Sequence, residues 1–214
     1  MRFVLNTRKL VYLLTTTLII GALAGAIVGI VLDPSTYFSG GIGNFFFGVL
    51  WMLGISAAIS LIAQMGHFAY LIFHRLALGV FKSIRLWNKI QVVLIVFVFF
   101  DLIYFRYIAF ASEDETIFGY MMMPFLLMLY CILVAYRKRQ ETNKEAFVPA
   151  LFFMFVITII EWIPALRLET VNDSKWLWIY LAPLLASNTW QLLTMHRLTG
   201  VPNHSKVATP KRAD

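Results

Sequence analysis

The stretch LVYLLTTTLIIGALAGAIVGIVL, residues 10–32, contains no charged residue, and its polar side chains are three consecutive threonines. A helix needs about 20 predominantly apolar residues to cross a hydrocarbon core about 30 Å thick. The stretch is long enough to do so, and further apolar runs follow it along the chain. It therefore predicts an all-α, polytopic integral membrane protein.

The composition of the whole chain agrees with this fold class. Of its 214 residues, 60% are hydrophobic and only 14% are charged. A soluble domain carries about 25% charged residues. A soluble domain of this length could not bury so much apolar surface and would expose large hydrophobic patches. The composition thus excludes an ordinary soluble protein.

Six apolar runs are candidate spans, and they cover residues 10–32, 43–73, 90–110, 117–136, 146–166 and 176–196. The second run is too long for one upright span, and beyond Gln64 it gains histidine and arginine side chains. It has to tilt, bend, or continue as an amphipathic helix that lies in the inner interface, and we expect the last of these. The predicted bundle of about six spans occupies residues 1–198, and a short, polar, disordered cytoplasmic tail occupies residues 199–214.

The basic residues predict the orientation. Of the 18 lysines and arginines, all but Arg106, Arg167 and Lys175 fall at the termini or in the even-numbered loops. The positive-inside rule therefore places both termini in the cytoplasm of a plasma-membrane protein. The net charge of +7 follows from this topology and from attraction to anionic lipid in the bilayer, and it does not require nucleic acid. A docking surface for an acidic partner is the open alternative.

Ionisable groups inside spans usually have a partner or a role. Asp101 lies about 16 Å from the inner end of the third span, and Glu161 lies about 22 Å from the inner end of the fifth. Arg106 lies at about the depth of Glu161, which favours an interhelical pair. Three roles remain open for these residues. They could form a structural ion pair or hold a protonated carboxyl, they could serve a conformational switch or a partner contact, or they could line an ion or proton pathway.

Other polar groups and a proline indicate how the spans pack. Gln64 and Asn188 lie in the inner halves of the second and sixth spans, where they can form hydrogen bonds between helices. Pro164 follows Glu161 by one turn, which predicts an irregular fifth span near its acid.

The first span also carries a stripe of small residues. Thr17, Gly21, Gly25 and Gly29 recur every four residues. Small residues at this spacing allow helices to approach closely. The stripe predicts either packing within the chain or contact with another membrane protein, including a second copy.

Motifs for catalysis, cofactors or metals are absent from the sequence. There is no Walker A loop, no H-E-x-x-H, no C-x-x-C and no G-x-S-x-G. The only cysteine, Cys131, lies within the fourth span. We therefore expect no enzyme, no cofactor and no metal site.

The chain resembles the KinB-signalling pathway activation protein family (KbaA) of spore-forming bacilli over about residues 5–198. The resemblance rests on length, six spans, the glycine-rich first span, and the segments VYLLTTT (11–17), FDLIY (100–104) and EWIP (161–164). It implies a plasma-membrane regulator that promotes the KinB sensor-kinase branch of the phosphorelay that starts sporulation. A membrane sensor histidine kinase is the implied partner.

Two other classes remain open. A small transporter or channel would use Asp101 and Glu161 on its pathway. An intramembrane enzyme would need polar residues clustered at one depth, which the sequence does not obviously supply.

Overall fold

The computed structural model describes residues 7–111, 116–166 and 174–199. The predicted tail lies outside the described residues from position 200 onward, as does Arg167. The described helices are α1 (Thr7–Leu32), α2 (Pro34–Phe38), α3 (Gly41–Phe81), α4 (Ile84–Phe110), α5 (Ile117–Glu141), α6 (Phe147–Phe152), α7 (Thr158–Leu166) and α8 (Ser174–Thr199). A 3₁₀ turn, Lys144–Ala146, precedes α6, and a π-helical turn, Phe153–Ile157, joins α6 to α7. The all-α prediction is confirmed.

Five helical segments are long and apolar enough to cross a membrane: Thr7–Leu32, Gly41–Phe81, Ile84–Ile108, Ile117–Glu141 and Lys144–Pro164. They correspond to the first five predicted spans. The sixth predicted span is a helix of 26 residues, α8, which is not among these five. The total of six spans therefore stays a prediction.

The second apolar run is one helix without a break. We expected a span followed by a separate helix in the interface, but α3 continues for 41 residues to Phe81. Residues 64–81 contain no proline, and the helix ends where Lys82 adopts a left-handed conformation with φ of 51°. At about 1.5 Å per residue α3 is about 60 Å long, about twice the thickness of the hydrocarbon core. If it spans a bilayer, a helix of this length has to cross it obliquely.

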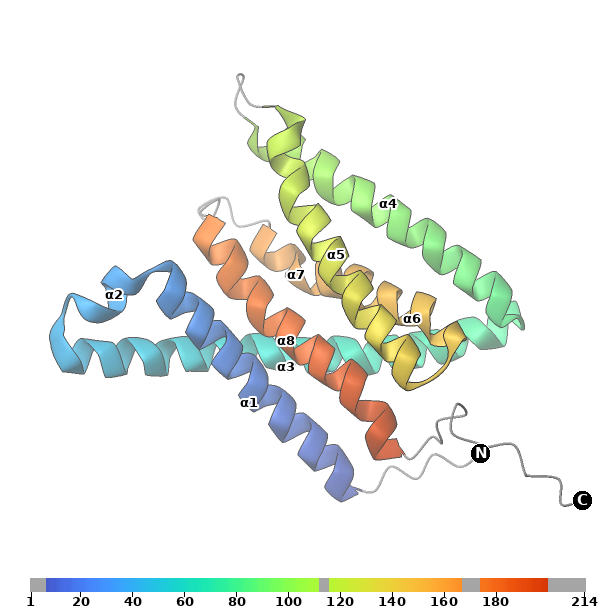
Figure 1. Ribbon diagram of the computed structural model, residues 1–214, viewed down its shortest axis with the longest axis horizontal. Coiled ribbons are helices and arrows are strands. Elements are labelled where there is room, and N and C mark those ends of the chain that lie inside the picture. The colour runs from blue at the N-terminus through green and yellow to red at the C-terminus, as the bar shows by residue number, and fades with distance from the viewer. Residues whose placement is uncertain (1–6, 112–115, 167–173, 200–214) are drawn as a thin grey trace, which may run out of the picture.

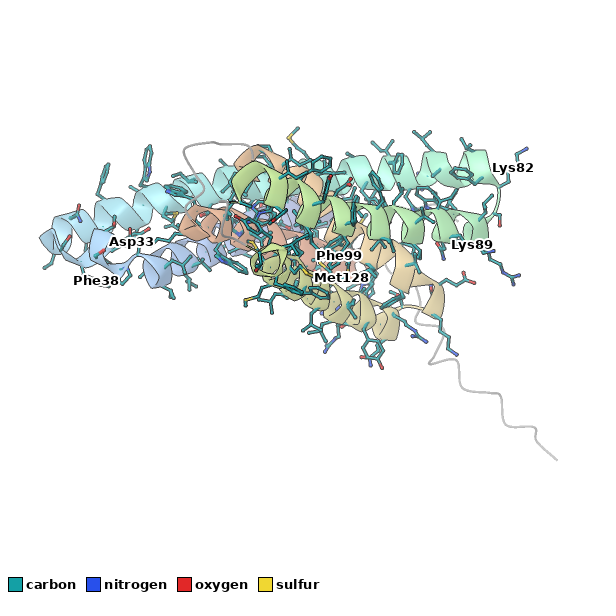
Figure 2. All side chains as sticks on the ribbon, turned by 90° about the horizontal axis from the view of Figure 1, so that it is seen from above. Asp33, Phe38, Lys82, Lys89, Phe99 and Met128 are labelled. Atoms are coloured by element: carbon teal, nitrogen blue, oxygen red, sulfur yellow. The ribbon has the colours of Figure 1, made fainter. Side chains whose placement is uncertain are left out.

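The long helix α3 runs at an angle to its neighbours, and the other helices are arranged around it. α1 and α8 lie side by side, and α3 crosses both of them (Figure 1). α4 and α5 form a hairpin on the other side of the bundle, and α6, the π turn and α7 lie between that hairpin and α8. Viewed from above, Asp33 and Phe38 lie at one end of the molecule, and Lys82 and Lys89 lie at the opposite end (Figure 2).

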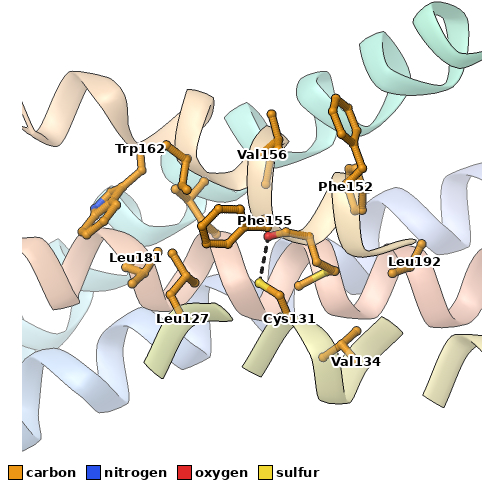
Figure 3. Close-up of a cluster of buried hydrophobic side chains, with 14 of the residues drawn as sticks. Leu127, Cys131, Val134, Phe152, Phe155, Val156, Trp162, Leu181 and Leu192 are labelled. Carbon is orange, nitrogen blue, oxygen red and sulfur yellow. Dashed lines mark hydrogen bonds between the residues drawn. The ribbon is translucent and has the colours of Figure 1, made fainter. Parts of the chain in front are cut away.

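The main hydrophobic core surrounds the π turn. Phe153 and Phe155 of that turn, Trp162 of α7 and Leu181 of α8 are fully buried. Cys131 of α5 lies in the same cluster, as Figure 3 shows. An apolar core of this kind packs α5, α7 and α8 together but leaves the polar residues on the opposite face of α8 to be accommodated by α1 and α3.

The fifth predicted span is irregular, as Pro164 led us to expect, but the irregularity lies elsewhere. Pro164 sits inside α7, which continues to Leu166. The departure from α-helical geometry is the π turn at Phe153–Ile157, directly before α7. π turns inside α-helices occur mostly as single turns and are frequent at functional sites.

Candidate functional site

Glu161 is the most deeply buried acid in the described part of the chain, with an exposed fraction of 6%. The side-chain amide of Asn188, on α8, donates hydrogen bonds to Glu161 Oε2 at 2.7 Å and to Thr158 Oγ1 at 2.9 Å. Asn188 and Thr158 are fully buried. Two residues singled out from the sequence, Glu161 and Asn188, therefore form one site between α7 and α8.

A glycine on α3 completes this site. A Cβ atom added to Gly66 would overlap Glu161 Oε1. Only glycine leaves enough room there for the carboxyl group to lie against the main chain of α3. The site thus lies where α3, α7 and α8 meet.

Several polar atoms of this region have no hydrogen-bond partner among the described residues. They include the second carboxyl oxygen of Glu161, Oε1, and the amide oxygens Oδ1 of Asn188 and Oε1 of Gln191. Buried polar atoms are usually paired, and an unpaired one costs about 1–3 kcal/mol. The site is therefore rich in acceptors and short of donors.

The structure does not bring Arg106 and Glu161 together. Arg106, on α4, donates a hydrogen bond to Met123 Sδ at 3.3 Å, and its guanidinium lies 5.9 Å from the ring centroid of Tyr120. Asp101, on α4, is half-buried. Among residues 7–111, 116–166 and 174–199, no ion pair joins Arg106 to Glu161 or to Asp101.

The small-residue stripe of α1 is buried against α3 and α8. Thr17, Gly21, Gly25 and Gly29 are all buried. A Cβ at Gly21 would lie 2.6 Å from Ser60 Oγ on α3 and would also overlap Ser187 Oγ on α8. The stripe therefore packs α1 within the chain, and these four positions present no exposed surface.

Hydroxyl and amide groups connect α1, α3 and α8 along this stripe. Ser60 Oγ donates to the main-chain oxygen of Thr17 at 3.1 Å and lies 2.8 Å from Ser187 Oγ. Gln64 Nε2 donates to the main-chain oxygen of Leu14 at 3.2 Å. Gln64 was predicted to bond between helices, whereas Ser60 was missed, although Ser56 and Ser60 are spaced by one turn in an otherwise apolar run.

A charged cluster joins the C-terminal ends of α5 and α8. Lys138 Nζ donates to the main-chain oxygen of Leu192 at 2.6 Å and lies 3.0 Å from His196 Nδ1. Glu141 pairs with Arg137 and Arg197, each at 2.8 Å. Sequence reasoning did not predict that these groups pair, because α5 and α8 are far apart along the chain.

A second polar contact lies at the opposite end. The side-chain hydroxyls of Thr36 and Ser35 donate to the carboxylate of Asp33, at 2.6 Å and 2.9 Å. Lys175, at the start of α8, pairs with the same carboxylate at 3.5 Å. The two hydroxyls, and Lys175 to a smaller extent, hold the pKa of Asp33 below its usual range. This contact fastens the turn after α1 to the start of α8.

Metal ligation finds no support in the described residues. No group of three or more His, Cys, Asp or Glu side chains lies close enough to hold an ion within residues 7–111, 116–166 and 174–199. The polar site can hold or release a proton and can hydrogen-bond between helices.

Comparisons with known proteins give a consistent result. A family model described as KinB-signalling pathway activation in sporulation (KbaA) matches residues 21–198. The KinB-signaling pathway activation protein of Bacillus subtilis (strain 168) is 40% identical over 195 residues, which cover 89% of this chain and 97% of that relative. No solved structure matches the chain.

Proposed function

The chain belongs to the KbaA family of KinB-signalling pathway activation proteins, and from that premise we propose that it is a membrane-embedded regulator of a KinB-type sensor kinase. It promotes the phosphorelay that initiates sporulation. The family membership carries this proposal. In this proposal the chain is a multi-pass protein of the plasma membrane, with both termini in the cytoplasm. The five apolar helices support insertion in a membrane. The one-sided distribution of basic residues supports the orientation, in which α8 is the sixth span.

The protein acts by contact and not by catalysis. The sequence contains no catalytic motif, and the largest connection between its predicted spans is too short to form a soluble domain. The buried polar site lies inside the bundle, away from any substrate in water. A regulator of this kind needs a helix surface that a partner's membrane helix can recognise.

The exposed outer half of α3 is the surface we assign to this contact. An apolar groove runs along it, lined by Phe47, Leu50, Trp51, Gly54, Ile55 and Ala58. A Cβ added to Gly54 would have no neighbour within 4 Å. Gly54 and Ala58 are one turn apart, so a second helix can approach closely between the larger side chains. The stripe on α1 offers no such surface, because α3 and α8 cover it.

Leucine substitution at Gly54 tests the assignment. Gly54→Leu fills the groove without a clash inside the chain, so the protein should reach normal membrane levels while KinB-dependent sporulation falls. Gly119→Leu is the matched control, because Gly119 is equally open but lies on α5. Unchanged signalling in Gly54→Leu at normal levels removes the groove from the proposal.

In-membrane crosslinking from α3 identifies the partner directly. A photoreactive residue at Leu50 or Trp51 should capture a membrane sensor kinase. Capture of a second copy of the chain alone would instead assign the groove to a homo-oligomer.

The transporter alternative gains no specific support. It needs Asp101 and Glu161 on one pathway, and no polar contact within the described residues links them.

A further inference from the structure

We propose that Glu161 is a proton-binding site. Its carboxyl group is held as a neutral acid where α3, α7 and α8 meet, and loss of the proton loosens the packing of these three helices. This inference is independent of the proposed kinase partner, and its test does not use signalling. It rests on the burial of the carboxyl group, its shortage of donors, the lack of a facing cation and its close approach to Gly66.

The shortage of donors is the first observation. An ionised carboxylate offers about four lone-pair sites to donors. Glu161 receives one hydrogen bond within the described residues, from Asn188 to Oε2 at 2.7 Å, and its Oε1 receives none. The residue is buried in the bundle, with an exposed fraction of 6%. A carboxyl group in such surroundings becomes neutral, because burial of the unpaired charge costs far more than binding a proton.

No positive charge from the neighbouring helices offsets the acid. The described elements packed against α7 are α3, α8 and the π turn, and the π turn consists of apolar residues. From α3 the titratable neighbour is His67, whose Nε2 faces Met195 Sδ at 3.2 Å. From α8 it is Tyr180, which interacts electrostatically with Glu161 but is a neutral phenol at ordinary pH. None of these groups supplies a counter-charge.

The place of the proton follows from Gly66. The unpaired oxygen, Oε1, is the one that lies against α3 at this glycine. A protonated Oε1 places a neutral hydroxyl in this close contact with α3. An ionised Oε1 would instead place an unpaired charge there, which is costly in an enclosed site. The neutral form therefore fits the junction, and the ionised form separates α7 from α3.

The π turn provides a place for that movement. It ends at Ile157, immediately before Thr158, the hydroxyl that shares the Asn188 amide with Glu161. A wide turn at this point can tighten or shift without breaking the rest of the span. Proton binding at Glu161 is thereby coupled to the position of α7 against α3, the longest helix of the described chain.

Infrared spectroscopy of the full chain in lipid bilayers tests the proposal. The difference between wild type and Glu161→Gln should contain the carbonyl stretch of a protonated carboxyl group at neutral pH. That band should give way to carboxylate bands as the pH is raised, with sodium concentration held constant. Asp101→Asn is the control, because it should leave the band in place.

Two results would overturn the proposal. Carboxylate bands from Glu161 at neutral pH would show that the acid is ionised in the folded protein. Loss of the protonated band on addition of sodium chloride at constant pH would show that the site takes a metal cation.

Thermal unfolding gives a second, independent measurement. The native state binds a proton that the unfolded state releases, so stability should fall as pH rises. Glu161→Gln should melt near the wild-type temperature at neutral pH and should lose this pH dependence. A wild-type melting temperature that rises or stays level as the pH is raised contradicts the proposal.

Discussion

Cys131 Sγ donates a hydrogen bond to the main-chain oxygen of Met154 at 3.2 Å, from the middle of α5 into the π turn (Figure 3). Both residues have an exposed fraction of 0%. The thiol is thus fixed in the part of the core where the helical geometry changes, and it is the only thiol of the chain. This makes Cys131 a natural reporter of the integrity of the π turn.

We predict that Cys131 does not react with a maleimide dye in the folded protein and reacts only as the bundle unfolds. Reactive cysteines are exposed thiols with access to the reagent, whereas buried ones are inert. The measurement is dye fluorescence during a thermal ramp in detergent. Cys131→Ala should give no signal. Lys82→Cys in the Cys131→Ala background should react before heating, because Lys82 is exposed.

Two glycine-to-alanine substitutions on α3 should have opposite effects. Gly54→Ala should stabilise the helix by about 0.5–1 kcal/mol, because alanine is the better helix former and the new Cβ has no neighbour within 4 Å. Gly66→Ala should destabilise the protein by about 1–3 kcal/mol through overpacking, because its Cβ would overlap the carboxyl group of Glu161. Unfolding measurements on the purified chain would check both predicted values.

A double-mutant cycle identifies the cause of the Gly66 effect. In a Glu161→Ala background the overlapping atoms are absent, so Gly66→Ala should cost much less than it does in the wild type. An equal cost in both backgrounds would mean that another neighbour of Gly66 is responsible.

The glycines of α1 should be required for folding. A Cβ at Gly25 would lie 2.7 Å from Ser56 Cβ and would overlap its hydroxyl. Gly21→Leu and Gly25→Leu should therefore lower the amount of folded protein in the membrane, which fluorescence-detected gel filtration measures. Gly119→Leu places the same side chain at an open position and should leave the amount unchanged. Normal levels of the α1 variants would contradict the packing described here.

Two neighbouring basic residues of α5 should differ in their contribution to stability. Lys138→Met removes a charged hydrogen bond to the main-chain oxygen of Leu192 and should cost about 1.5–3 kcal/mol. Arg137 pairs with Glu141, but its side chain is 64% exposed, so Arg137→Met should cost less than about 1 kcal/mol. Chemical or thermal unfolding at low and high salt distinguishes the two, since only the exposed pair should weaken markedly with salt.

The proposed topology can be measured with single cysteines in a Cys131→Ala background. Ser39 and Lys82 are exposed and lie at opposite ends of α3. A thiol reagent that does not cross membranes should label Ser39→Cys in intact cells. It should label Lys82→Cys only after the cells are opened. The reverse pattern would invert the orientation deduced from the basic residues.

Hydropathy predicted the helices well because the long helices carry apolar side chains on their exposed faces as well as in the core. It failed to describe how the second run ends. An apolar segment with a few basic residues suits both a helix in the interface and an oblique continuation of the span. Nothing in residues 64–81 breaks the helix, and its packing against α1 and α8 decides its direction.

The polar site was predicted in part. The intramembrane positions of Glu161 and Asn188 identified them as candidates, and the structure joins them by a hydrogen bond. The expected pair of Glu161 with Arg106 rested on depth alone. Depth fixes where a side chain lies along the membrane normal, but the rotation of each helix decides which neighbour it faces. Gly66 gave no signal, because a single glycine in an apolar helix is common.

The last helix of the chain has a consequence for how the protein is made. α8 is not among the five helices that are long and apolar enough to cross a membrane, and it buries four polar side chains, Ser187, Asn188, Gln191 and Thr194. Ser187 and Gln191 meet polar groups of α3, and Asn188 meets α7. Both of these helices leave the ribosome before α8. We therefore expect α8 to enter the membrane against a helix surface that is already in place. In a rearranged protein in which α8 comes first, we expect that α8 does not insert into the membrane.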